Sequence, residues 1–495
     1  MIKKFILAYI KMGIGQKKNI MSFIIAGIPA GKKISSLFVW DRNIFFYKWI
    51  LCVCIFFISQ RTLAHTYYIN SRWGNDANTG KTKDSAWQSC HNLDKNKFFP
   101  GDSILFAKGS SYSGGFIFTS SGTPKKPIVF SSYSAGADMV LNNDRSKLQD
   151  IFIRYGAGRH PSFSNPSWDV INGNVFRIEG SYIVIDGLYF HDNTNPPNSD
   201  HKNKNVQKMG AVYLASGTHH NIVRNCEFYN SPVGVKIKGK YNLITRNYFH
   251  DTYDTMAHSW GPIAIMVVTP YNEISWNKIV NYGSYGGPYG SDGGVVELDG
   301  VDDAFDGRNV YIHHNISINN HGFLELAGRN VDSITVAYNL SDDRNQFIGG
   351  GSMKNILVFN NTVIRTREPN VDRYIFWTFN RDSTFLTVRN NIFVFAKDIK
   401  VFGPYIKPAG HKRAMVGEQV HDHNLYYSIG NADPIGIAAG KGDKIANPLF
   451  IDFENRNFRL KKNSPAINAA IKLGYTEDLD GRPVSKSPDI GAFEY

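Results

Sequence analysis

Three acidic side chains lie in two short segments that alternate apolar and polar residues. Glu297 and Asp299 belong to Val295-Val296-Glu297-Leu298-Asp299, and Glu325 lies in Leu324-Glu325-Leu326. Two carboxyl groups held close together cannot both ionise easily, so one keeps its proton while the other is charged. Such a pair can supply the acid and the nucleophile or base that cleavage of a glycosidic bond requires.

The placement of these acids depends on a repeat in which an aliphatic residue is followed by two variable residues and asparagine. The asparagines of this repeat are Asn225, Asn247, Asn277, Asn315, Asn339, Asn361 and Asn391. A short period lengthened in some copies by insertions is typical of a stacked solenoid. Segments with period two indicate that each coil consists of short strands. We expect each asparagine to hold a left-handed turn and to hydrogen-bond to the asparagines of neighbouring coils.

Counting back from each asparagine aligns the strands of successive coils, once seven extra residues in the coil of Glu297 and about three in the coil of Glu325 are assigned to loops. One predicted column contains Tyr213, Lys236, Met266, Glu297, Glu325 and a position near Gly349 or Gly350. Two residues further on, a second column contains Ala215, Lys238, Val268, Asp299 and Ala327. The residues between the columns, Leu214, Ile237, Val267, Leu298 and Leu326, should point into the core. Since stacked coils lie about 4.8 Å apart, we expect Glu297 and Glu325 to lie side by side on the outer face, in an open trough.

The same residues are compatible with three functions, of which we favour the first. In hydrolysis, Glu325 would be the acid and Glu297 or Asp299 the nucleophile, without a cofactor. Aromatic and charged side chains nearby would then bind the sugar, namely Tyr213, Tyr285, Tyr289, His321 and Arg329.

The second function is β-elimination on a uronate polymer, in which a lysine, Lys236 or Lys238, removes a proton from the sugar. Calcium would then be bound by the acids Asp299, Asp302, Asp303 and Asp306. In the third function the solenoid is a non-catalytic glycan-binding surface, and the acids are ordinary solvated side chains. Those acids lie in a long interruption of the repeat, which purely structural coils do not need, and this favours an enzyme.

The first 64 residues differ from the rest of the chain. The apolar stretch 45–59 follows Lys and Arg residues and ends near Thr62-Leu63-Ala64, which predicts a secretory signal ending near Ala64. The stretch is short for a membrane span. This leader carries ten basic residues and one acid, so 9 of the net charge of +13 belong to it and +4 remains. The high isoelectric point is therefore no argument for nucleic-acid binding. We expect a monomeric protein, secreted, periplasmic or on the bacterial surface, with a polysaccharide partner and no membrane contact beyond the signal.

The segments at both ends of the remaining chain resemble a known group. They are Tyr67-Tyr68-Ile69, Gly74-Asn75-Asp76 and Pro100-Gly101-Asp102 near the start, and Asn447-Pro448-Leu449-Phe450 and Asp489-Ile490-Gly491-Ala492-Phe493 near the end. In these segments residues 66–495 are similar to secreted bacterial right-handed parallel β-helix proteins of the pectate-lyase-like superfamily. The resemblance implies an all-β right-handed parallel β-helix and action on a polysaccharide. It does not fix the chemistry, because the superfamily includes lyases, hydrolases, epimerases and binding proteins.

These observations predict the organisation of the chain. Residues 1–64 would be the leader, 65–430 the β-helix domain and 431–495 a C-terminal capping tail of the same domain. A short helix within Trp87 to Lys97 would cover the open end of the first coil, where backbone groups and apolar side chains are otherwise exposed.

Overall fold

A computed structural model of the chain describes residues 63–134, 160–168, 170–193, 208–252, 261–285, 291–300, 305–328, 331–351, 353–367, 374–378, 385–396, 399–402, 418–430 and 434–495. The side chains of Ser284, Tyr285 and Ser291 are outside this description. The predicted leader lies outside it as well, except for Leu63 and Ala64, and residues from Ala64 to Tyr495 form one compact unit.

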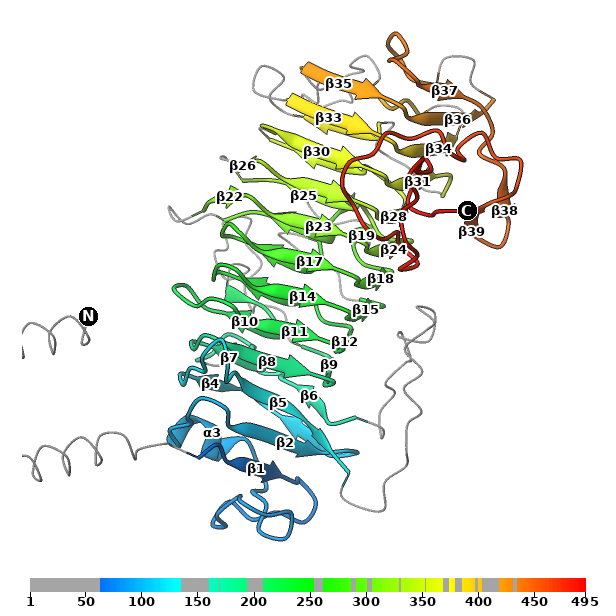
Figure 1. The fold of residues 1–495 in the computed structure, drawn as a ribbon. Coiled ribbons are helices and arrows are strands. Elements are labelled where there is room, and N and C mark those ends of the chain that lie inside the picture. The colour runs from blue at the N-terminus through cyan, green and yellow to red at the C-terminus, as the bar shows by residue number, and fades with distance from the viewer. Residues whose placement is uncertain are drawn as a thin grey trace, which may run out of the picture. The chain divides into compact units, whose positions relative to one another are not determined.

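Three long parallel sheets are built by successive coils of this unit (Figure 1). The first sheet contains, in order, β1 (Thr66–Ile69), β2 (Ser103–Ala107), β5 (Ile128–Tyr133), β8 (Ile183–Asp186), β11 (Ile222–Arg224), β14 (Leu243–Thr245), β17 (Glu273–Ser275), β23 (Tyr311–His313), β27 (Thr335–Ala337), β30 (Ile356–Phe359), β33 (Phe385–Arg389) and β35 (Glu418–Asp422). The second contains β3 (Ser111–Ser113), β6 (Ser162–Ser164), β9 (Tyr189–His191), β12 (Glu227–Tyr229), β15 (Tyr248–His250), β18 (Lys278–Val280), β24 (Ile316–Ile318), β28 (Leu340–Asp342), β31 (Thr362–Arg365), β34 (Ile392–Ala396), β36 (Leu425–Ile429) and β37 (Lys444–Ile445).

The third sheet positions the predicted column of acids. It contains β4 (Phe116–Phe118), β7 (Phe176–Ile178), β10 (Val212–Leu214), β13 (Val233–Ile237), β16 (Ile263–Val267), β21 (Gly294–Leu298), β25 (Leu324–Leu326), β29 (Ile348–Gly350) and β32 (Phe376–Thr378). Smaller pairs are β19 (Ser284–Tyr285) with β20 (Ser291–Asp292), β22 (Gly307–Arg308) with β26 (Val331–Asp332), and β38 (Phe450–Asp452) with β39 (Asn457–Leu460). The predicted all-β parallel β-helix is confirmed.

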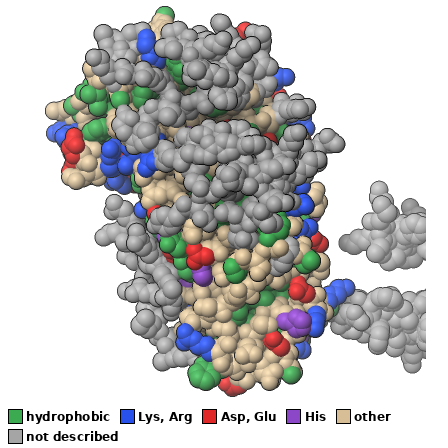
Figure 2. Space-filling model, turned by 180° about the vertical axis from the view of Figure 1, so that it is seen from behind, with side chains coloured by type: hydrophobic (Ala, Val, Ile, Leu, Met, Phe, Trp, Pro, Cys, Tyr) green, Lys and Arg blue, Asp and Glu red, His purple; other side chains and the backbone are tan. Residues whose placement is uncertain are grey.

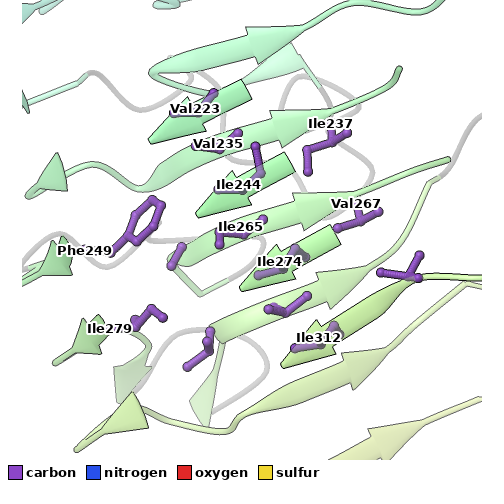
Figure 3. Close-up of a cluster of buried hydrophobic side chains, with 14 of the residues drawn as sticks. Val223, Val235, Ile237, Ile244, Phe249, Ile265, Val267, Ile274, Ile279 and Ile312 are labelled. Atoms are coloured by element: carbon purple, nitrogen blue, oxygen red, sulfur yellow. The ribbon is translucent and has the colours of Figure 1, made fainter. Parts of the chain in front are cut away.

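The interior of the solenoid is filled by aliphatic and aromatic side chains from all three sheets. On β13 and β16 every second residue points inward, and Val235, Ile237, Ile265 and Val267 have no exposed surface. Figure 3 shows these residues stacked coil upon coil with their counterparts from the other sheets. Leu214, Leu298 and Leu326 are equally buried, as the period-two pattern predicts.

A column of buried asparagines follows the first sheet. Its members are Asn247, Asn277, Asn315, Asn339, Asn361, Asn391 and Asn424. In each of the first six, the backbone N–H and the side-chain amide both donate to the side-chain oxygen of the next member, at 2.9–3.0 Å. Asn424, the last member, donates in the same way to Asp443 Oδ1, at 2.8 and 3.3 Å. The predicted asparagine contacts between coils are therefore confirmed.

The start of this column differs from the prediction. Val223 is the register partner of Ile244, so Cys226 takes the place assigned to Asn225, and its N–H donates to Asn247 Oδ1 at 3.0 Å. Asn225 stands one residue earlier, with a φ of 52°. The prediction that one asparagine fills both roles was wrong, because the left-handed turn belongs to the residue before each ladder asparagine.

Left-handed residues mark all three corners of the coils. Between the third and first sheets they are Tyr182, His220, Tyr241, Tyr271, Asn309, Ser333 and Asn355. Between the first and second sheets they are Asn225, Arg246, Trp276, His314, Tyr338, Asn360, Asn390 and His423. Between the second and third sheets they are Asp192, Asn230, Asp251, Asn281 and Asn319. A left-handed conformation costs an ordinary residue about 1–2 kcal/mol, which contacts between coils must offset.

The N-terminal end of the solenoid is covered by helix α3 (His91–Lys95), inside the range in which a helix was predicted. Leu93 is buried, and Asp94 Oδ1 accepts the N–H of Ile117 on β4 at 2.8 Å. Since β4 is the edge strand of the third sheet, the helix satisfies a backbone group that would otherwise face outward.

The C-terminal segment lies against the outer face of the second sheet (Figure 1). Phe450, Phe458, Leu460, Ile490 and Phe493 pack there against side chains of β28, β31, β34 and β36. The second sheet extends to β37, so the solenoid continues beyond residue 430 into the segment assigned to the tail. No helix in the described part of the chain is long and apolar enough to span a membrane.

Candidate active site

The outer column of the third sheet has the register that the sequence predicts. Tyr213 pairs with Lys236, Lys236 with Met266 and Met266 with Glu297. Glu297 then pairs with Glu325, and Glu325 with Gly349. The two glutamates are therefore direct neighbours on adjacent parallel strands, held by backbone hydrogen bonds rather than by a loop.

The column is far less open than the predicted trough. Glu297 is only 7% exposed and Lys236 is completely buried, whereas Glu325, Asp299 and Lys238 are half-buried. The prediction followed from the outward direction of the side chains, which holds, but direction alone does not guarantee solvent. Met266 is buried too, in a small apolar cluster on this outer face with Met209, Val233, Ile263 and Trp168.

Burial changes the acidity of Glu297. Removal from water, followed by the negative charges of Glu325, Asp299 and Asp292, raises the pKa of this carboxyl well above its usual range. The ammonium group of Lys236 opposes that rise but does not cancel it. A carboxyl group that keeps its proton beside other acids can donate that proton to a leaving group.

Asp292 is a member of the acidic group that the sequence-based site assignment left out. Its carboxylate accepts the backbone N–H groups of Gly293 at 2.9 Å and Gly261 at 3.2 Å. It lies at the end of β20, immediately before β21 begins. Asp292 and Glu297 are five residues apart and lie on either side of the turn into β21, so the sequence did not show that their charges interact.

The segment between Asp299 and Asp306 begins and ends at adjacent points of the preceding coil. The N–H of Asp299 donates to Val267 O at 3.2 Å, and the N–H of Asp306 donates to the next carbonyl, that of Val268, at 3.0 Å. Residues 300–305 are thus added without disturbing the pairing with the preceding coil.

Phe305 holds the base of this loop. It packs against the main core, and its ring occupies the space left by Gly300, Gly307 and Gly328. A β-carbon at Gly307 or Gly328 would overlap the ring. The sequence signal for this arrangement is the group of glycines on either side of a lone phenylalanine, which becomes meaningful only when the coils are aligned.

Two of the predicted sugar-binding residues already have partners. The guanidinium group of Arg177 lies over the ring of Tyr213 at 5.1 Å from its centroid, and Tyr213 is 6% exposed. Asn345 contacts His321, with Asn345 Nδ2 at 2.8 Å from His321 Nδ1. Because an amide NH₂ group only donates, His321 Nδ1 is the acceptor in this contact.

The position of Asn345 is fixed by a charge inside the solenoid. Arg365 is 1% exposed, and its guanidinium donates to the carbonyl oxygens of Asn345, Ser341 and Gln346. These bonds bind the turn that leads from the second sheet into β29, next to the strand of Glu325. Burial lowers the pKa of Arg365 to about 10, against the charges of Asp343 and Asp342.

Trp377 continues the column past Glu325 and was not predicted. It pairs with Gly349, and a β-carbon on that glycine would overlap the indole ring. The ring therefore lies over Gly349, one strand from Glu325. The sequence did not show this relation, because the alignment of the coils by their repeat asparagines ended at Gly349 or Gly350.

Four predicted site residues, Tyr289, Asp302, Asp303 and Arg329, lie outside the described residues, and so does the side chain of Tyr285. Of the four predicted calcium ligands, Asp299 and Asp306 are described. Both oxygens of Asp306 are bound by Arg308, at 2.6 and 2.8 Å. Among the described residues no group of three or more His, Cys, Asp or Glu side chains could hold a metal ion. The calcium site also requires Asp302 and Asp303, so it stays a prediction.

Comparison with known proteins gives a sequence relative that matches part of the chain. The chain matches no family model. It is 27% identical over 131 residues to the lacto-N-biosidase of Bifidobacterium longum subsp. longum, a match that covers 25% of this chain and 8% of that protein. The match thus spans a small part of the length of the curated relative.

Solved structures give the same fold at low identity. The complex of XylC with xylose has a TM-score of 0.50 and 12% identity, and the match covers 86% of this chain and 98% of that chain. Pectate lyase Pel9A has a TM-score of 0.49 and 14% identity, with 88% and 98% covered. The lacto-N-biosidase of Eubacterium ramulus has a TM-score of 0.37 and 15% identity, with 82% and 71% covered. At 12% identity the likeness to XylC is a likeness of fold alone, and the three long parallel sheets show that this chain is a parallel β-helix.

Proposed function

We propose that this chain is a secreted glycoside hydrolase that cleaves a polysaccharide with the carboxyl groups of Glu297 and Glu325. The observation that carries the proposal is the direct strand pairing of the two residues, together with the raised pKa of Glu297. The partial similarity to a lacto-N-biosidase supports the same class of chemistry.

The proposed roles reverse those expected from the sequence. Glu297, buried and protonated, would donate a proton to the oxygen of the leaving group, and Glu325, half-buried on the next strand, would attack the sugar. A pair about one strand spacing apart leaves no room for a water between them, which favours a covalent intermediate and retention of configuration. Asp292 and Asp299 would act through their charges, by keeping the proton on Glu297.

The charge of the site favours a neutral substrate. The site contains four acids and two lysines. The acids are Asp292, Glu297, Asp299 and Glu325, and the lysines, from the same columns, are Lys236 and Lys238. A uronate polymer would bring further carboxylates to this group. The described part of the face seen in Figure 2 carries both acidic and basic side chains, not a uniformly basic surface.

Elimination on a uronate polymer remains the second candidate because Lys236 lies in the column with Glu297 and interacts with its charge. In that reaction Lys236 or Lys238 would have to reach the sugar C5 proton. Lys236 is completely buried and its Nζ contacts Met266 Sδ, whereas Lys238 is half-buried. Hydrolysis requires neither lysine to act as a base and uses the paired acids directly, so we favour it.

The test is to incubate the full chain with neutral polysaccharides (xylan, mannan, galactan) and uronate polymers (alginate, polygalacturonate). New reducing ends from a neutral polymer, without the ultraviolet absorbance of an unsaturated sugar, are the expected result. Absorbance from a uronate polymer would establish elimination. Glu273→Gln, on the first sheet, is a matched control whose activity should equal that of the unchanged protein.

A further inference from the structure

Four aromatic rings form a continuous stack at the corner between the third and first sheets. We call Tyr182, His220, Tyr241 and Tyr271 the corner row. Their ring centroids are 5.1, 5.2 and 5.0 Å apart, with interplanar angles of 17°, 20° and 9°. The rings thus lie one above another along successive coils, and since neighbouring rings cover each other's faces, mainly their edges are left for other contacts.

The backbone does not require aromatic residues at these positions. All four have a left-handed φ between 56° and 62°, which bulky side chains rarely adopt. The following coils place Asn309, Ser333 and Asn355 at the same corner position. Asparagine tolerates this conformation better, so the aromatic side chains are kept at a conformational cost. Strain of this kind points to a function.

A second aromatic stack, at the next corner, shows what covers such a surface in this protein. Trp276, His314 and Tyr338 stack with centroids 4.3 and 5.2 Å apart. The C-terminal segment lies on them: His314 Nε2 contacts the carbonyl oxygen of Glu477 at 3.1 Å, and Tyr475 packs on Tyr338. Tyr338 is consequently 2% exposed.

The corner row, in contrast, is exposed. Tyr241 is 50% exposed and Tyr271 is 44% exposed. A stacked, rigid set of amphipathic rings loses little conformational entropy when it binds a partner. The chain covers one stack with its own C-terminal segment and presents the other to solvent.

The corner row is continuous with the candidate active site. Tyr241 follows Lys236 by five residues in the same coil, and Tyr271 follows Met266 by five in the next. The N–H of Tyr271 donates to the carbonyl oxygen of Asn309 at 3.1 Å, and Arg308 binds Asp306 at the base of the loop that follows Asp299. The row therefore lies at the corner into which the strands of the acid column lead.

We propose that the corner row binds an extended stretch of a neutral polysaccharide that runs parallel to the solenoid axis. This inference rests on the proposed function and extends it to a second contact with the same polymer. One pyranose of an extended chain is about as long as the spacing between rings, so successive sugars would meet successive edges. The phenol and imidazole groups hydrogen-bond to sugar hydroxyls, while ring edges contact the C–H groups. Neither kind of contact requires a charged group on the polysaccharide.

The experiment replaces the two exposed tyrosines by the residue that the chain itself uses at this corner. The variant Tyr241→Asn/Tyr271→Asn is made in a Glu297→Gln background, which prevents cleavage during the measurement. Affinity for xylan, mannan and galactan is measured by electrophoresis through gels that contain each polymer, and thermal unfolding is followed in parallel. Trp73→Asn, which changes an 84% exposed aromatic residue in the N-terminal loop, is the control.

We expect the double variant to bind its polymer about tenfold more weakly and to unfold at an unchanged or slightly higher temperature, because asparagine relieves strain. Trp73→Asn should change neither quantity. Unchanged affinity in the double variant would overturn the inference, as would the absence of binding to every polymer. If stability falls together with affinity, Tyr241→Phe/Tyr271→Phe decides, since it keeps the stack: weaker binding at full stability supports the inference, and full affinity overturns it. Cleavage by the unchanged protein is scored separately, so binding without cleavage would contradict the proposed hydrolysis and not the corner row.

Discussion

Glu297 on β21 and Glu325 on β25 are direct register partners in adjacent parallel strands of the third sheet. Their relative position is set by the backbone hydrogen bonds of the sheet, which is more rigid than a pair of loops. The burial of Glu297 and the half-exposure of Glu325 then give two chemically identical groups different environments. That difference is what acid and nucleophile roles require.

Replacement of Glu297 by glutamine should lower kcat about 10²- to 10⁴-fold on the neutral polymer that the protein cleaves, because the amide cannot donate a proton to the leaving group. The loss should be smaller for aryl glycosides whose leaving groups need no proton. Initial rates on both substrate types check this. An equal loss on both would show that Glu297 is not the acid.

Glu325→Gly should lose activity to a similar extent, and added azide should restore part of it. The small anion can occupy the space of the missing carboxylate and attack the sugar in its place. The product, a glycosyl azide of inverted configuration, is identified by nuclear magnetic resonance. If azide leaves the rate of Glu325→Gly unchanged while the variant folds normally, the nucleophile is another residue.

The Glu297→Gln variant should also be more stable than the unchanged protein at alkaline pH. The folded state holds the pKa of Glu297 above its unfolded value of about 4.3, so its stabilising effect is complete below that value and is lost as the pH rises through the folded pKa. Glutamine does not ionise, so the variant does not lose stability in this way as the pH rises. Thermal unfolding temperatures should therefore agree near pH 4 and diverge by pH 8, with the variant higher. A constant difference at all pH values would contradict the shift, and Glu179→Gln, an exposed change, is the control.

Phe305→Ala should destabilise the protein by about 2–3 kcal/mol, less than a fully buried phenylalanine, since the ring is only partly buried. It should also reduce activity, because the loop base between Asp299 and Asp306 loses its support. Phe305→Leu, which keeps most of the apolar volume, should recover most of both. Chemical unfolding and kcat are the measurements. A stable, fully active alanine variant would show that the ring does not position the loop.

Asn277→Ala should cost about 2–4 kcal/mol of stability by leaving the buried N–H groups of Asn247 without the oxygen that they share. Asn96→Ala, which removes one exposed side-chain bond beside α3, should cost far less. Comparison of unfolding midpoints separates the two. Equal costs would mean that the ladder contributes no more than a surface contact.

The fold and the register of the acids could be predicted because both follow from periodicity. A repeat of two along each strand fixes which side chains point outward, and the asparagine spacing aligns Glu297 with Glu325. The register of the ladder slipped at Asn225, because Cys226 occupies the ladder position there and Asn225 stands at the left-handed turn one residue earlier.

The openness of the site could not be predicted in the same way. Burial of Lys236 and Glu297 depends on what lies over the outer face, and side-chain direction gives no information about that. The partners of the site were hidden for a related reason. Arg177 lies over Tyr213, and Trp377 lies over Gly349, each from another coil and beyond the reach of any local pattern.

The bonds from Asp299 and Asp306 to the consecutive carbonyl oxygens of Val267 and Val268 have an evolutionary consequence. The preceding coil holds Asp299 and Asp306, and Phe305 is anchored on the core, so the chain between Gly300 and Phe305 can be lengthened, shortened or exchanged while the stacked strands stay as they are. In the proposed hydrolase, substrate preference can thus diverge at that position without any change to the strands that carry Glu297 and Glu325.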